Sequence, residues 1–331
     1  MRKPYKPLCL QPARLQGGGS VQQGLSAAFE FPRLGWRRGA ADKRYSLAII
    51  YPPNGPTAHI MNTPDLSTIP RTPISSVAEY VQRVVETSTA MGLAYGNLWF
   101  RGIAKKELKL VPGVVWRSVT DEDSILEEFM VSLPAYSTKN HDDPWELYSL
   151  MQHHGLPTRL LDWSKSPLAA LFFALDFDES KAAHDQTPVV WAMNPYALNH
   201  LSHRKEALFV PLTRFGHSGD EMLVDPYLPM CLRPFRISPG TSLSPRPIAV
   251  EPPFTNPRVL AQQGCFTVHG SDTTALEEIP GMGAHLLTIE VAPDKTPALR
   301  EELEQLGFRA EWIYQDVDRL SKRIIAERCT P

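Results

Sequence analysis

The segment MQHHGLPTRLLDWSKSPLAALFFAL, residues 151–175, combines polar side chains suited to ligand binding with a long apolar run. Six candidate residues flank a predicted junction between a buried strand and a helix: His154, Thr158, Arg159, Asp162, Trp163 and Ser164. The N–H groups that begin a helix favour anions, and a guanidinium binds phosphate or carboxylate through two parallel hydrogen bonds. The pattern predicts one wall of a polar cleft. The alternative is an internal ion pair between Arg159 and Asp162, with a helix cap from Ser164 or Ser166.

Two distant segments supply further candidates for the same cleft. Arg101 ends the short aromatic strand NLWFRG, where its guanidinium must reach a cleft or lose its hydration at a large cost. Gln262 and Gln263 precede a tight turn into a strand in AQQGCFT, and the alternative there is a hydrogen bond that only closes the loop. The chain has neither a Walker loop nor G-x-G-x-x-G after a strand, so we do not expect a phosphate-binding glycine loop.

One of the positioning elements is a helix from Pro144 to about His154. Asp143 is its predicted cap, Pro144 takes the favoured first position, and Gly155 supplies the left-handed residue after its end. Helical spacing puts His154 on the apolar face with Leu147, Leu150 and Met151, while His153 is rotated away. We therefore expect His154 to point inward or into the cleft, and the alternative is a core histidine without a functional role.

The remaining pattern predicts an α+β fold with mixed or antiparallel sheets and packed helices. A capping box at Ser76 begins a helix, a second helix fits 121–133 with Thr120 as its cap, and an apolar helix follows Ser166. Strands are expected at TRLLDW, PVVWAMN, Cys265–Val268 and HLLTIEV. Because strands and helices do not alternate regularly, a doubly wound parallel sheet is not favoured.

The chain divides into a predicted arm and a predicted domain. Residues 1–70 read as a basic, loosely structured N-terminal arm, which either contacts nucleic acid or is a solvated tail. The ordered domain is expected over 71–331. Within it, about 195–253 is rich in proline and reads as an irregular insertion over the surface.

Composition narrows the class of protein. The 331 residues are 43% hydrophobic and 21% charged, with a net charge of −2, which argues against a nucleic-acid binder with a basic field over the whole surface. The four cysteines are widely separated and lack zinc-ligand spacing, so reduced thiols and no metal are expected. No apolar run reaches the roughly 18 residues of a membrane span, and Gly- and Gln-rich sequence rather than an apolar h-region follows the basic start, so we do not expect a secretory signal. We expect a cytoplasmic protein with no membrane partner.

Four segments together resemble the FRG-domain family of bacteria and phages: LWFRG, QHHGLPTRLLDWSKSPLAALFFAL, NPRVLAQQGCFTVHG and GFRAEWIYQDVDRLSKRI. The family takes its name from the residues that stand here as Phe100, Arg101 and Gly102. The resemblance covers roughly residues 75–325, interrupted by the proline-rich segment. It implies no reaction, because the family is named for a motif, and a role in bacterial defence or toxicity follows only by association.

A looser similarity, to NAD-dependent ADP-ribosyltransferases, implies a split sheet and a reaction. Those enzymes share an arginine that ends a strand, a Ser/Thr-bearing strand that runs into a helix, and a Glu- or Gln-containing turn before a late strand. Arg101-Gly102, LLDWSKSPLAALFFA and AQQGCFT occur here in that order. The similarity implies that Arg101 holds the diphosphate or adenosine ribose of NAD as substrate.

The same similarity assigns the other candidate residues. Asp162, Trp163 and Ser164 would line the nicotinamide side, His154 would pack against the ribose or donate to it, and Gln262 or Gln263 would face the reacting ribose. The catalytic set is then Arg101, His154, Asp162 and Gln263, and the NAD-binding set is Arg101, Gly102, Thr158, Arg159, Trp163, Ser164 and Gln262. A glutamine at the third motif is neutral, so either Asp162 stabilises the developing cation or the site binds a nucleotide without efficient turnover.

A non-enzymatic role is the competing hypothesis. Arg101, Arg159 and Trp163 would grip a phosphate and stack a base, as in modules that recognise single-stranded nucleic acid, and the basic arm would add affinity. In a third interpretation the motif is a buried scaffold and the function lies in the proline-rich segment. The acceptor, protein or nucleic acid, and the oligomeric state do not follow from the sequence.

Overall fold

The structure is a computed structural model that describes residues 63–329, except 94–95, 178–185, 212–220, 236, 239 and 253–256. Residues 1–62 of the predicted basic arm are not among the described residues, whereas residues 63–70 are. No helix in the described ranges combines the length and apolar character needed to cross a membrane.

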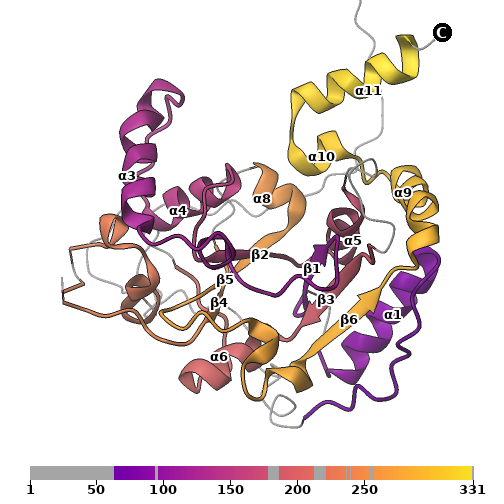
Figure 1. The fold of residues 1–331 in the computed structure, drawn as a ribbon, viewed down its shortest axis with the longest axis horizontal. Helices are drawn as coiled ribbons and strands as arrows, with labels where there is room; N and C mark the ends of the chain where they lie inside the picture. Colours follow the sequence, from indigo (N-terminus) through magenta and orange to yellow (C-terminus); the bar gives the residue numbers. More distant parts are fainter. Residues whose placement is uncertain are drawn as a thin grey trace, which may run out of the picture. The chain divides into compact units, whose positions relative to one another are not determined.

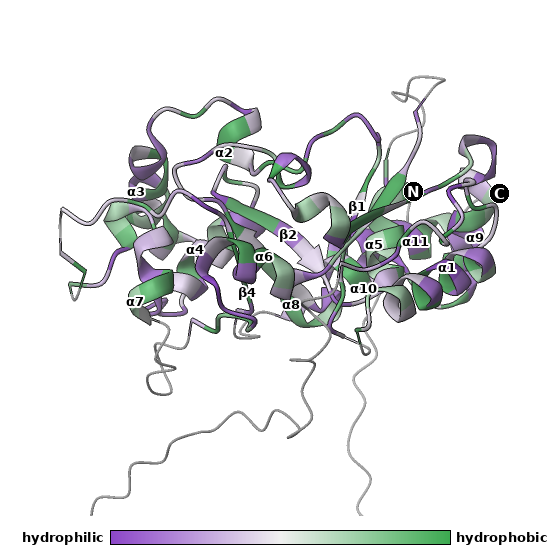
Figure 2. Ribbon diagram, turned by 90° about the horizontal axis from the view of Figure 1, so that it is seen from below, coloured by the Kyte–Doolittle hydropathy of each residue, from purple (hydrophilic) through white to green (hydrophobic). Residues whose placement is uncertain are grey.

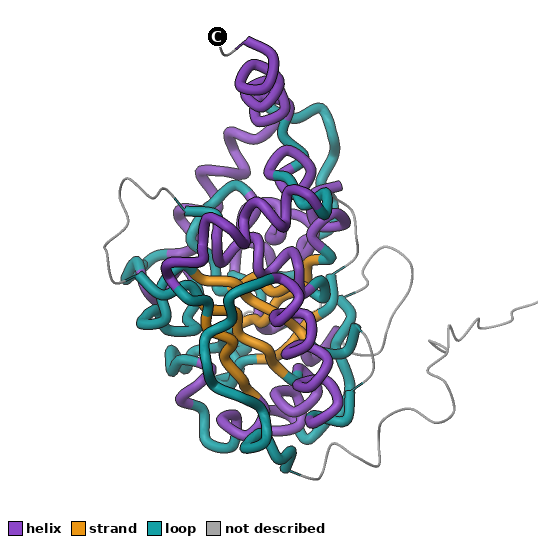
Figure 3. The backbone as a smooth tube through the Cα atoms, turned by 90° about the vertical axis from the view of Figure 1, so that its right-hand side faces the viewer, coloured by secondary structure: helices purple, strands orange, loops and turns teal. Residues whose placement is uncertain are grey.

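A six-stranded antiparallel sheet forms the centre of the fold (Figures 1 and 3). Its strands are β1 (Trp99–Ile103), β2 (Leu160–Ser164), β3 (Val189–Met193), β4 (Ile248–Val250), β5 (Gly264–Val268) and β6 (Leu286–Glu290). Their order across the sheet is β4-β5-β2-β1-β3-β6. With the helices packed around this sheet, the predicted α+β class is confirmed.

The expected split sheet is replaced by one sheet with a narrow junction at its middle. Strands β1 and β2 share a single residue pair, Phe100 with Ser164, whereas β1–β3, β2–β5 and β3–β6 each pair over five positions. The halves β4-β5-β2 and β1-β3-β6 are therefore joined by very little backbone pairing. We call this junction the seam.

Eleven α-helices surround the sheet in the described part of the chain. They are α1 (Val77–Ala90), α2 (Gly113–Trp116), α3 (Glu122–Ser132), α4 (Pro144–His153), α5 (Pro167–Leu175), α6 (Pro195–His203), α7 (Glu221–Val224), α8 (Pro257–Gln262), α9 (Thr296–Gln305), α10 (Ala310–Tyr314) and α11 (Val317–Cys329). Short 3₁₀ helices connect them at η1 (Leu133–Ala135), η3 (Asp225–Tyr227), η4 (Met230–Leu232), η5 (Leu276–Glu278), η6 (Met282–His285) and η7 (Pro293–Lys295).

Alternate strand residues face two apolar cores on opposite sides of the sheet. Leu161 and Cys265 belong to a core that includes residues of α1, α5 and α9. Leu160 and Phe266, one residue away in the same strands, belong to a second core with α3 and α4. Successive side chains of a strand point to opposite faces, so both faces of this half of the sheet are covered. In Figure 2, α1 shows mixed green and purple, as expected for a helix that buries only one side.

The caps that position α4 follow the sequence. The Asp143 side chain accepts hydrogen bonds from the N–H groups of Trp145 and Glu146, Pro144 begins the helix, and Gly155 has a φ of 83° just beyond its end. In α3, however, the cap is Asp121, which accepts from Ser124 N, and the predicted cap at Thr120 is wrong. Both are good capping residues, and the helix begins one residue later than expected.

The prediction of an irregular surface insertion over about 195–253 is wrong for the described part of that segment. Pro195–His203 forms α6 with Leu198 fully buried, and Ile248–Val250 forms β4 at the edge of the sheet. Phe209 and Tyr227 lie in the second core. Pro195 is the first residue of α6 and Pro226 the second of η3, where the missing N–H costs nothing, so these two prolines stand at the starts of elements.

Candidate functional site

A cleft with a cavity volume of about 330 Å³ lies at the seam. Residues of β1, α4, β2, α5 and α8 line it, and its chemically active side chains are Arg101, Gln152, His153, Asp162, Trp163, Ser164, Arg258 and Gln262. We call it the Arg101 cleft. Among its lining side chains that the structure describes, two guanidinium groups face one carboxylate.

Arg101 is held across the seam by the neighbouring strand. Its Nη1 donates a hydrogen bond of 2.6 Å to the main-chain oxygen of Asp162. Burial lowers the pKa of the Arg101 guanidinium, and the charge of Asp162 raises it. A guanidinium has five donors and stays protonated in proteins, so Arg101 keeps donors for a ligand after this bond is made.

A chain of hydrogen bonds orients the Asp162 carboxylate. Gln152 Nε2 donates to Asp162 Oδ2 at 2.6 Å, and Gln152 Oε1 accepts from Thr158 Oγ1 at 2.6 Å. The Thr158 hydroxyl accepts in turn from the N–H of Leu160 at 3.0 Å. Thr158 is buried, and it therefore acts through Gln152 to fix the amide that holds the carboxylate.

The second guanidinium, Arg258, comes from α8. It lies 4.7 Å from the ring centre of Tyr314, and its Nη1 is 3.3 Å from His153 Nε2. Burial is the main cause that lowers the pKa of His153 to about 4, and the nearby charges of Arg258 and His154 contribute to this shift. His153 is thus neutral at pH 7, and the positive charge on this side of the cleft belongs to Arg258.

Trp163, Ser164 and Gln262, also predicted from the sequence, form local hydrogen bonds in the cleft. Trp163 is buried, with Nε1 donating to Thr267 Oγ1 at 3.1 Å. Ser164 Oγ donates to the main-chain oxygen of Gln262 at 2.6 Å, and Gln262 Nε2 donates to Ile313 O at 3.1 Å. These contacts join β2 to β5 and α8, and α8 to α10.

Gly102 lines the cleft where β1 passes close to α5. A Cβ atom at this position would lie 1.8 Å from the main-chain oxygen of Ala170 and 2.5 Å from the nitrogen of Ala174. The strand and helix can approach this closely only without a side chain at residue 102.

The expectation that His154 points into this cleft is wrong. His154 is the residue after α4, with ψ at 8°, and its side chain is exposed and lines a different pocket. Its neighbour His153 lines the Arg101 cleft instead. The helical-face argument fails because the helix ends at His153.

Arg159 and Gln263 also lie away from the residues that line the cleft. Arg159 forms an ion pair with the buried Glu122, so the alternative of a pair with Asp162 is wrong as well. Gln263 is exposed, has a φ of 48°, and offers its main-chain oxygen to Lys165 N. Ser166 provides the predicted cap of α5, accepting from Ala169 N. The catalytic or binding roles assigned to all these residues stay predictions.

Sequence reasoning missed Gln152, His153 and Arg258. Ser149, Gln152 and His153 follow i, i+3, i+4 spacing, which places polar groups on one face of α4. Arg258 precedes Gln262 by one helical turn in α8. Both signals were readable once the helix boundaries were known.

The fold and site define an α+β protein with a basic cleft at the centre of an antiparallel sheet. Residues 96–184 match the family model of the FRG domain, so the chain contains an FRG domain. The match spans β1 to α5 and includes Arg101, Gln152, His153 and Asp162, whereas Arg258 and Gln262 lie beyond it. No curated protein and no solved structure matches the chain. Within the described ranges, no three His, Cys, Asp or Glu side chains cluster as metal ligands would.

Proposed function

We propose that the Arg101 cleft binds NAD and that the protein transfers its ADP-ribose group to an acceptor. The observation that carries the proposal is the placement of two guanidinium groups, Arg101 and Arg258, around the fixed carboxylate of Asp162. A diphosphate needs clustered cations, and cleavage of a glycosidic bond needs negative charge near the sugar. One cleft contains both.

Arg101 and Arg258 support the binding of the diphosphate. Charge-assisted hydrogen bonds from guanidinium to phosphate are short and strong, and partial burial strengthens them by excluding water. A cavity of about 330 Å³ is at the lower end of the usual range for ligand sites, roughly 300–1,000 Å³. The cleft would therefore enclose the central part of a dinucleotide, with its ends reaching past the rim.

Asp162 supports the reaction. When the bond between the ribose C1′ and the nicotinamide nitrogen breaks, nicotinamide leaves with the bonding electron pair and positive charge develops on the ribose. A carboxylate already held by Gln152 stabilises that charge without reorganising. The acceptor then forms a new bond to C1′ and loses its proton. The amide of Gln262 is neutral, which suits hydrogen bonding to a ribose hydroxyl.

The test is incubation of the purified protein with adenylate-labelled NAD and a whole-cell extract, with free nicotinamide measured in parallel. Arg101→Ala and Arg258→Ala should each lower label transfer about tenfold or more, since a hydrogen bond to a charged group contributes about 1.5–3 kcal/mol. Arg71→Ala removes an exposed arginine that does not line the cleft and should behave as wild type.

Two results decide against the proposal. Absence of both transfer and nicotinamide release from the wild-type protein would refute it. Salt-dependent binding of nucleotides or single-stranded nucleic acid without NAD consumption would favour the recognition module instead. Unfolding midpoints of the arginine variants must match wild type for the comparison to hold, because Arg101 also bonds to β2.

A further inference from the structure

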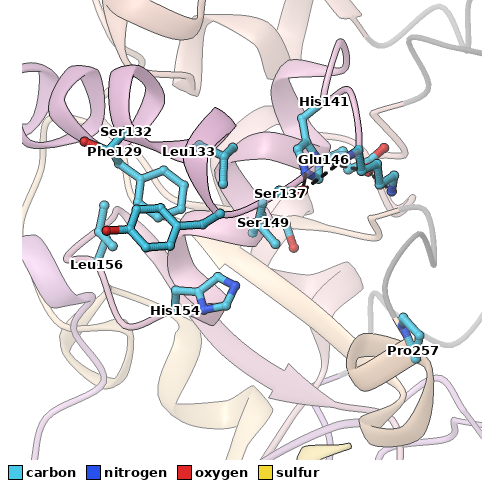
Figure 4. Close-up of a pocket in the computed structure, with 13 residues that line it drawn as sticks. Phe129, Ser132, Leu133, Ser137, His141, Glu146, Ser149, His154, Leu156 and Pro257 are labelled. Carbon is cyan, nitrogen blue, oxygen red and sulfur yellow. Dashed lines mark hydrogen bonds and ion pairs between the residues drawn. The ribbon is translucent and has the colours of Figure 1, made fainter.

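A second and larger pocket also lies beside α4. It has a cavity volume of about 680 Å³ and is lined by residues of α3, η1, the loop before α4, α4 itself and the first residue of α8. Figure 4 shows its labelled side chains around a common space, with Phe129, Leu156 and His154 towards one end and His141 with Glu146 at the other. We call it the Phe129 pocket.

The first end of the Phe129 pocket offers flat and apolar surfaces. The rings of Phe129 and His154 have centroids 6.4 Å apart and an interplanar angle of 33°. Tyr136 lines the same pocket with 87% of its surface exposed, and Leu156 is half-buried. Rings arranged in this way stack against the face of another planar ring.

The other end is polar and carries both donors and acceptors. Glu146 is buried and forms an ion pair with Lys139, and His141 Nδ1 lies 3.5 Å from Glu146 Oε1. The His141 side chain is 9% exposed, and this Nδ1 has no hydrogen-bond partner among the described residues. Ser137 and Ser149 add hydroxyl groups to the lining.

We propose that the Phe129 pocket binds a nucleobase. A ligand of this class has a flat face for Phe129, Tyr136 and His154, and an edge with donors and acceptors for the polar end. A purely apolar ligand would place apolar atoms against the hydroxyl groups of Ser137 and Ser149. An organic cation is disfavoured because Lys139 already neutralises Glu146.

The pocket and the Arg101 cleft both border one small cavity. Ser149 lines both the Phe129 pocket and a small cavity of about 30 Å³. His153, Asp162, Trp163 and Gln262 line that small cavity and also the Arg101 cleft. A base in the pocket has two possible sources: the adenosine half of a dinucleotide whose diphosphate lies in the Arg101 cleft, or a separate nucleotide. Both sources present the same chemistry to Phe129 and Tyr136.

The experiment is a titration with 2-aminopurine riboside, whose fluorescence is quenched when it stacks on aromatic rings. Tyr136→Ala and His154→Ala should each weaken binding about fivefold or more, which corresponds to the lower end of the stacking contribution of one side chain. Both residues are exposed, so neither substitution opens a cavity in the core. Phe235→Ala, which removes an exposed ring that does not line the pocket, should leave binding unchanged.

The same titration overturns the inference if the wild-type protein does not quench the probe. Equal affinity in wild type and both variants overturns it too, as does displacement by N-acetyl-tyrosinamide but not by unlabelled nucleosides. Repeating the titration with NAD separates the two sources: competition identifies the adenine of the dinucleotide, and simultaneous binding identifies a separate base. Because the probe carries no nicotinamide, this test does not depend on the proposed transferase function.

Discussion

Gly102→Ala gives the most direct test of how β1 is positioned. The new methyl carbon would start 1.8 Å from Ala170 O, while real contacts of this kind stay beyond 3.0 Å, so the strand and α5 must separate by at least 1.2 Å. Overpacking a core costs about 1–3 kcal/mol. Three backbone atoms lie within 3.0 Å of the new carbon, and a backbone cannot rotate away as a flexible side chain does. We therefore expect a loss of about 3 kcal/mol in the free energy of unfolding.

The measurement is urea unfolding monitored by far-ultraviolet circular dichroism. Midpoints are compared between variants for which the unfolding free energy has the same slope against urea concentration. Gly283→Ala is the matched control, because a Cβ at residue 283 meets nothing within 4 Å, and it should change stability by less than about 0.5 kcal/mol. Adding Ala170→Gly to Gly102→Ala should not restore stability, since the clashing oxygen remains. A Gly102→Ala protein as stable as the control would refute the packing argument.

Two further predictions concern protonation and the held carboxylate. Burial lowers the pKa of His269 from 6.5 to about 4, so its contribution to stability is complete above pH 6.5 and is lost as pH falls towards 4. The loss amounts to about 3 kcal/mol in the free energy of unfolding. When thermal unfolding is measured against pH, the His269→Leu variant should lack this part of the pH dependence. Identical pH profiles for the wild type and the variant would contradict the prediction. Under the proposed function, Gln152→Ala releases the Asp162 carboxylate and should lower the rate of nicotinamide release about tenfold, with NAD affinity changed less than twofold. An equal loss in affinity would assign Gln152 to ligand binding rather than to positioning.

The sequence predicts the local features of the site well, because they depend on neighbouring residues. Asp143, Pro144 and Gly155 define α4 from capping chemistry alone, and the apolar run after Ser166 identifies α5. The strand that carries Asp162 follows from its apolar flanks.

What the sequence does not reveal are the contacts between distant segments. Arg258 contacts His153, which is 105 residues earlier in the sequence, and no local pattern in either segment predicts this contact. Arg159 pairs with Glu122 instead of Asp162 because α3 and β2 contribute to the same apolar core, a tertiary relation that local pattern does not encode. In the proline-rich segment, the strand Ile248–Val250 is only three residues long, too short to show a period.

Because of its place at the seam, Arg101 both lines the cleft and contacts the neighbouring strand β2. Only one residue pair joins β1 to β2, so the hydrogen bond from Arg101 Nη1 to Asp162 O is an additional contact between the two halves of the sheet. Under the proposed function, an anion in the cleft would compete with the main-chain oxygen of Asp162 for the donors of Arg101. The same side chain therefore lines the cleft and joins the two halves of the sheet, so substitution of Arg101 changes both the cleft and the contact between β1 and β2.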